Sequence, residues 1–133
     1  MKTIFEKIIN REIPADIVYE SEKSIAFLDI QPVEKGHLLL VSKQPYPWMT
    51  DVPESEIAEI FREAQKIMHV MKKSLGCDYV QLGVVGKDVP HFHIHLIPRY
   101  LEISEEDPGM RKHTPYENNE EKNNFVEKIK NAF

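Results

Sequence analysis

Apolar residues recur along the chain with two different periods, and the two periods predict helices and strands. Spacings of three and four residues predict a short helix over residues 3–9 and a long helix from about residue 54 to residue 75. Apolar and β-branched runs predict strands, which we place at residues 17–19, 24–29, 37–42, 79–85 and 91–98. A last amphipathic stretch over residues 125–133 predicts a short closing helix.

The order of these elements predicts the class of fold. One helix, three strands, a long helix and two strands follow one another with short connections. Short connections join antiparallel neighbours, so we expect an α+β fold with one five-stranded, mainly antiparallel sheet. We expect residues 1–101 to form the domain. Residues 102–133 would be a polar C-terminal extension that ends in a short helix.

Composition narrows the class of protein further. The 133 residues are 41% hydrophobic and 29% charged, as in a globular protein with one core. The formal net charge of −5 argues against a nucleic-acid partner, because such proteins are usually basic. Cys77 is the only cysteine, the N-terminus shows no signal pattern, and no apolar run reaches the roughly 20 residues that span a bilayer. We therefore expect a cytoplasmic protein without a membrane partner.

The candidate chemistry lies in the last predicted strand. His91, His93 and His95 occupy alternate positions, and the apolar residues Phe92, Ile94 and Leu96 lie between and after them. Alternate side chains of a strand point to opposite faces. We therefore expect the three imidazoles to share one face and the three apolar side chains to pack on the other.

Three interpretations of this pattern remain open from the residues alone. Neighbouring histidines of the three could bind one metal ion. However, His91 and His95 would lie about 13 Å apart at roughly 3.3 Å per residue, so another ligand such as His37 would be needed. The histidines could also be solvated residues of a sheet face. Alternatively, a neutral imidazole could attack a phosphorus atom while a neighbouring ring holds the phosphate oxygens.

The sequence from His91 to Ile97 resembles the His-x-His-x-His-x-x signature of the histidine triad (HIT) superfamily. The segments before it are similar to the Hint (histidine triad nucleotide-binding) branch and stand in the same order. They are Phe5-Glu-Lys-Ile8, Glu12-Ile-Pro14-Ala15, Val18-Tyr-Glu20, Ala26-Phe-Leu-Asp29-Ile30, Pro32 and Gly36-His37. The resemblance covers about residues 3–100.

The resemblance implies a nucleotidyl hydrolase or transferase that acts at the α-phosphate of a purine nucleotide of the AMP or GMP type. His93 would be the nucleophile and would form a nucleotidyl-histidine intermediate. His95 would contact the α-phosphate. The backbone carbonyl of His91 would hold the ring of His93, and His37 would lie close behind the triad.

The resemblance also implies where the nucleotide binds. Asp29 would accept hydrogen bonds from the ribose hydroxyls. An apolar slot for the base would be lined by Phe5, Ile8, Ile13, Phe27 and Ile30. Lys87, Asp88 and Val89 would lie at the phosphates. No metal or other cofactor is implied.

Two residues depart from the pattern of the phosphoramidase members. Lys87 and Asp88 stand where those proteins have Gln and Ser. Lys87 would bind a β-phosphate, which favours dinucleotide polyphosphates or nucleoside diphosphate compounds as substrates. Family members are homodimers joined through the long helix and a strand, so we expect a ten-stranded sheet across two chains. The alternative function is a nucleotide-binding regulatory or scaffold protein with little turnover.

Overall fold

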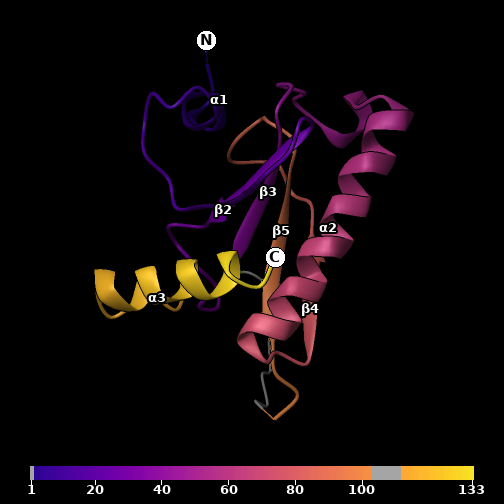
Figure 1. Ribbon diagram of the computed structural model, residues 1–133. Helices are drawn as coiled ribbons and strands as arrows, with labels where there is room; N and C mark the ends of the chain where they lie inside the picture. Colours follow the sequence, from indigo (N-terminus) through magenta and orange to yellow (C-terminus); the bar gives the residue numbers. More distant parts are fainter. Residues whose placement is uncertain (1, 103–111) are drawn as a thin grey trace.

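Five strands form one sheet in the computed structural model, which describes residues 2–102 and 112–133 (Figure 1). They are β1 (Ile17–Glu20), β2 (Ser24–Leu28), β3 (Leu38–Ser42), β4 (Tyr79–Gly83) and β5 (His93–Arg99). Their order across the sheet is β1-β2-β3-β5-β4, and every neighbouring pair is antiparallel. The predicted α+β class and the five-stranded antiparallel sheet are therefore confirmed.

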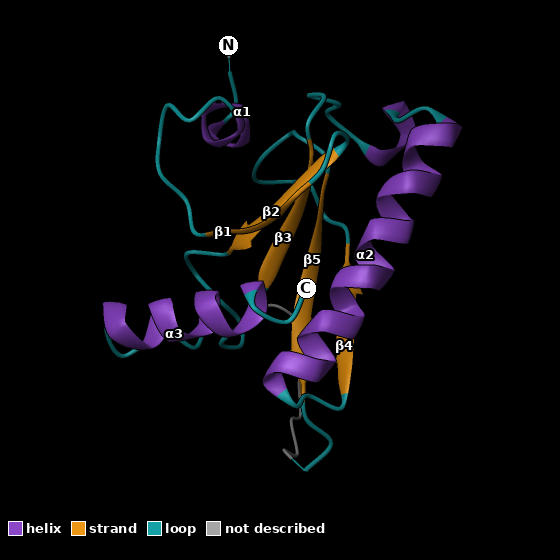
Figure 2. Ribbon diagram, in the orientation of Figure 1, coloured by secondary structure: helices purple, strands orange, loops and turns teal. Residues whose placement is uncertain are grey.

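Helices cover both faces of the sheet (Figure 2). Helix α1 spans Ile4–Ile9, α2 spans Glu54–Leu75 and α3 spans Asn119–Lys130. The larger core lies between the sheet and the helices α2 and α3, and it includes Leu40, Ile94 and Leu96. The smaller core lies on the other face, where Phe5 and Ile8 of α1 pack against β2 and β3. Phe92, Ile94 and Leu96 thus pack in one core, as the alternation predicted.

The long helix α2 forms where the apolar stripe predicted it. Ile60, Ala64, Ile67 and Met71 recur every three or four residues, and all are buried against the sheet. Gly76 ends the helix with φ 69°, a left-handed conformation that glycine adopts without strain. Charged residues cover the outer side of α2. No helix within the described ranges is both long and apolar enough to cross a membrane.

The closing helix begins earlier than the apolar spacing indicated. We predicted it over residues 125–133, whereas α3 begins at Asn119. The side chain of Asn118 accepts a hydrogen bond from the backbone N–H of Glu121, and this cap starts the helix within a polar stretch. Val126 and Ile129 of α3 are buried in the larger core. The last turns of the chain are therefore part of the packed structure.

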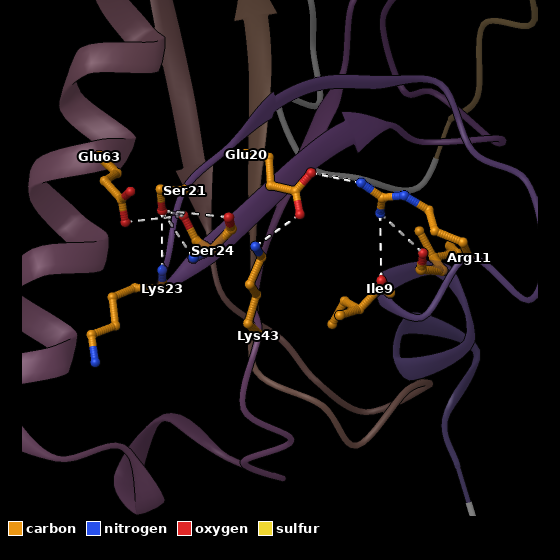
Figure 3. Close-up of polar contacts among 9 residues, drawn as sticks. Ile9, Arg11, Glu20, Ser21, Lys23, Ser24, Lys43 and Glu63 are labelled. Atoms are coloured by element: carbon orange, nitrogen blue, oxygen red, sulfur yellow. Dashed lines mark hydrogen bonds and ion pairs between the residues drawn. The ribbon is translucent and has the colours of Figure 1, made fainter.

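Polar contacts join α1 and α2 to the first hairpin (Figure 3). The buried carboxylate of Glu63 on α2 accepts a hydrogen bond of 3.0 Å from the hydroxyl of Ser24 on β2. At the sheet edge, Glu20 forms ion pairs with Arg11 at 2.6 Å and with Lys43 at 2.8 Å. Exposed pairs of this kind contribute little stability, but together they fix the segment that leads from α1 into β1.

Candidate active site

The predicted strand of histidines is shorter than the sequence indicated. It was placed at residues 91–98, but β5 begins at His93. His93 and His95 lie directly opposite Val41 and Leu39 of β3, so they share the sheet face that α1 covers. His91 precedes the strand. The carbonyl of His91 accepts a hydrogen bond from the ring of His93, two residues further along the chain.

Hydrogen bonds fix the orientation of His91. The hydroxyl of Thr3, which caps α1, lies 3.0 Å from His91 Nδ1. On the other side, His91 Nε2 lies 2.7 Å from the backbone carbonyl of Ser42. A carbonyl only accepts, so the neutral ring has its proton on Nε2 and accepts from the hydroxyl at Nδ1. The cap of the first helix therefore helps to hold the first histidine of the triad.

The same reasoning assigns the proton of His93. Its Nδ1 lies 2.7 Å from the backbone carbonyl of His91, so Nδ1 donates. In the neutral ring, Nε2 then has no proton and presents a lone pair. Phe5 packs edge-on against the ring with the centroids 4.9 Å apart, which restrains its rotation. The ring lines a cavity that Phe5, Phe27 and Asp29 also line.

A second pair of rings, those of His37 and His95, is oriented by a backbone group of the loop after β2. The backbone N–H of Val33 donates to Nδ1 of His37 over 3.1 Å. The proton of the neutral His37 ring must therefore be on Nε2, which lies 3.0 Å from Nδ1 of His95. His37 donates, His95 accepts at Nδ1, and the proton of His95 is left on Nε2. His95 can then donate to an anion in the cavity.

Burial keeps these rings neutral. It lowers the pKa of His37 to about 3, helped by the neighbouring charge of His95, and lowers the pKa of His95 to about 4, helped by that of His93. Burial also lowers the pKa of His91 and of His93. For His93, the hydrogen bond to the His91 carbonyl and the charges of Asp29 and Asp88 oppose the shift in part.

The histidines face a cavity of about 610 Å³. Every residue predicted to contact the nucleotide lines this cavity: Phe5, Ile8, Ile13, Phe27, Asp29, Ile30, Lys87, Asp88 and Val89. His37, His93 and His95 line it as well, whereas His91 lies behind them. The cavity thus has an apolar wall, an imidazole wall and a loop with one positive and one negative side chain.

Several lining residues were missing from the prediction. They are Ile4, Pro14, Ala15, Leu28, Gln31, Val33, Leu39, Val85, Gly86 and His113. Most of them stand next to a predicted residue in the sequence. The sequence alone does not show which of these neighbours face the cavity. Gly86 has φ 78°, and a Cβ there would lie 3.2 Å from the ring of Trp48, so the loop before the triad lies against that ring. His113 comes from the C-terminal extension, and the histidine motif at residues 91–97 does not predict that this extension reaches the cavity.

Asp29, His37 and His95 also have the geometry of a possible metal site, since their ligand atoms all lie within 4.8 Å of one another. However, His37 Nε2 would have to lose its proton to bind an ion. Nδ1 faces the N–H of Val33 and cannot take that proton up. His37 is therefore better suited to donate to His95 than to ligate a metal. Burial raises the pKa of Asp29, whose Oδ2 lies 3.5 Å from His37 Nε2.

Comparison with known proteins identifies the family. A model of the HIT domain matches residues 10–102. An uncharacterised HIT-like protein of Methanocaldococcus jannaschii is 45% identical over 102 residues, which are 73% of this chain and 78% of that protein. The chain belongs to the HIT, or histidine triad, family.

Particular relatives and a solved structure extend this result. Adenosine 5′-monophosphoramidase of Saccharomyces cerevisiae is 35% identical over 76% of this chain and 65% of its own length. The asymmetrical bis(5′-nucleosyl)-tetraphosphatase of Schizosaccharomyces pombe is 29% identical over 65% of this chain and 50% of its own length. A crystal structure of a HIT-like protein from Bartonella henselae, described as involved in cell-cycle regulation, has a TM-score of 0.83 at 29% identity and covers 99% of this chain and 96% of that one. Relatives of this chain thus include enzymes named as nucleotide hydrolases.

Proposed function

We propose that the protein is a nucleotidyl hydrolase or transferase that acts at the α-phosphate of a purine nucleotide conjugate. The observation that supports this most is the 2.7 Å contact between His93 Nδ1 and the His91 carbonyl. It leaves the lone pair of Nε2 free on a ring that burial keeps neutral. The rings of His93 and His95 lie side by side, with their centroids 5.1 Å apart. The proton on His95 Nε2 is therefore available for an oxygen of a phosphate whose phosphorus His93 attacks.

In the proposed reaction, the Nε2 lone pair of His93 forms a bond to the α-phosphorus, and the bond to the leaving group breaks with its electron pair. The proton on His95 Nε2 stabilises the charge on the phosphate oxygens. Water then attacks the nucleotidyl-histidine, and the nucleoside monophosphate leaves with the lone pair returned to His93. Two displacements replace one difficult step. In this proposal Asp29 accepts hydrogen bonds from the ribose, and Phe5, Ile8 and Phe27, which line the same cavity, contact the base.

The first experiment looks for the intermediate. The protein is mixed with adenosine 5′-phosphoramidate or diadenosine tetraphosphate, quenched in alkali, and its intact mass is measured. We expect the mass of the chain plus one adenylyl group, and we expect none with the His93→Ala variant. Binding of AMP by the wild-type protein with neither adduct nor turnover would instead support a regulatory or scaffold function.

Lys87 is expected to influence the choice of leaving group. It is exposed in the loop that lines the cavity, where its ammonium can reach a β-phosphate. Its neighbour Asp88, when ionised, can only accept hydrogen bonds and has no proton for an amine leaving group. We expect Lys87→Ala to lower kcat/KM for diadenosine tetraphosphate about tenfold more than kcat/KM for adenosine phosphoramidate, as the loss of one charged contact implies.

The matched control is Lys72→Ala, which removes an exposed lysine from α2. Both substrates should be cleaved by this variant as by the wild type. An unchanged ratio of the two kcat/KM values in Lys87→Ala would remove Lys87 from substrate selection.

We also propose a homodimer joined at β4. This strand is an edge of the sheet, and unpaired edges are templates for another strand. Large apolar side chains are exposed on it and just after it, namely Tyr79, Leu82, Val84 and Val85. Pairing of two such edges would give a ten-stranded sheet and would cover these side chains. Sedimentation equilibrium would support the proposal with the mass of two chains and refute it with the mass of one.

A further inference from the structure

The C-terminal extension returns to the cavity of its own chain. His113 Nδ1 lies 2.8 Å from the backbone carbonyl of Gln31, and the N–H of Thr114 donates to the carbonyl of Pro32 over 2.7 Å. These two successive hydrogen bonds align the extension with the loop that follows β2. Because a carbonyl only accepts, Nδ1 of His113 donates, and its ring orientation is fixed.

Further contacts extend this attachment toward α3. The N–H of Gly36 donates to the hydroxyl of Tyr116 over 2.9 Å, and Lys35 forms an ion pair of 2.9 Å with Glu121. The loop from residue 29 to residue 37 is therefore held by the extension along its length. Asp29 begins this loop and His37 ends it, so the extension supports both residues.

His113 lines the cavity beside Asp29. With Nδ1–H donated to Gln31, the neutral ring has a lone pair on Nε2. The side chain of Asp29 accepts the N–H of Gln31 at Oδ1, over 2.9 Å. The side chains of His113 and Asp29 are close enough to interact electrostatically. The rim of the cavity therefore has two neighbouring acceptors, a carboxylate and an imidazole nitrogen, on one side.

We propose that His113 completes the ribose subsite, with Nε2 accepting a hydrogen bond from one hydroxyl of the ribose while Asp29 accepts from the other. This inference rests on the proposed function, because it requires a nucleotide in the cavity. A ribose offers two vicinal O–H donors, and the rim offers two acceptors. The pairing favours ribonucleotides over deoxynucleotides, since a missing hydroxyl leaves one acceptor unpaired.

The test uses a variant that separates the two nitrogens of the ring. His113→Asn keeps an amide N–H at about the position of Nδ1, so the hydrogen bond to the Gln31 carbonyl can persist, and it removes Nε2. Dissociation constants of AMP, 2′-deoxy-AMP and 3′-deoxy-AMP are measured by titration calorimetry for the full chain. We expect the wild type to prefer AMP over one deoxy analogue about tenfold. In His113→Asn this preference should fall to about twofold, with the affinity for that analogue unchanged.

The control is Lys112→Ala, which alters the exposed neighbour and should leave all three dissociation constants as they are. A general loosening of the extension would weaken AMP and both analogues by the same factor in His113→Asn, and that result would overturn the proposal. An unchanged preference for AMP would overturn it as well. If the wild type binds none of the three nucleotides, the proposed function itself fails. The two failures are thus distinguished.

Discussion

Replacing His93 with alanine is expected to lower kcat/KM for every nucleotide substrate by on the order of 10³-fold or more. In the proposed mechanism the variant loses the lone pair that attacks phosphorus, while the proposed contacts of His95 and Asp29 with the nucleotide remain. We therefore expect the loss in kcat, with the dissociation constant of AMP changed only a few-fold. Steady-state kinetics and AMP titration measure the two quantities separately.

A matched variant and a rescue experiment make this prediction specific. His69 is an exposed histidine of α2, so His69→Ala should keep kcat/KM within about twofold of the wild type. The alanine at position 93 leaves space that free imidazole can enter, and added imidazole should restore part of the turnover of His93→Ala. If His93→Ala retains activity within tenfold of the wild type, His93 is not the nucleophile.

The sequence predicted the face and the neighbours of these histidines because both follow from a two-residue period. Once β5 is a strand, Ile94 and Leu96 must face one core and His93 and His95 the other. The burial of the long helix followed from its period of three to four in the same way. The family resemblance then supplied the cavity residues, and the structure brings all of the predicted ones to a single cavity.

The protonation of the rings could not be predicted from the pattern. It depends on single backbone groups, such as the Ser42 carbonyl and the Val33 N–H, whose directions are set by turns outside the motif. The contact of Thr3 with His91 joins residues 88 positions apart in the chain. The position of His113 follows from hydrogen bonds of an extension with little apolar pattern. The signal that was missed there is the helix cap at Asn118, which anchors α3.

The buried histidines are also expected to make the fold unstable in mild acid. Burial lowers the pKa of His37 to about 3 and of His95 to about 4, whereas both titrate near 6.5 in the unfolded chain. As pH falls below 6.5, the unfolded chain binds a proton at each ring and the folded chain does not. The free energy of unfolding therefore drops by about 1.4 kcal/mol per pH unit for each ring.

From pH 6.5 to pH 5 the two rings together imply a loss of at most about 3 kcal/mol, a large fraction of the stability of most domains. His91 and His93, whose pKa values are also lowered, steepen the fall. The carboxyl groups of Asp and Glu titrate mostly below pH 5. Between pH 6.5 and pH 5 the histidines therefore account for most of the change in the free energy of unfolding. Urea unfolding at half-unit steps from pH 7.5 to pH 5 measures the slope.

His37→Asn removes one titrating ring, so its slope should be shallower by about one proton even if the variant is less stable at every pH. The same slope in His37→Asn as in the wild type would mean that His37 binds a proton equally well in both states. In that case His37 could not serve as the fixed donor that sets the proton of His95, and the proposed order of donors in the site would be wrong.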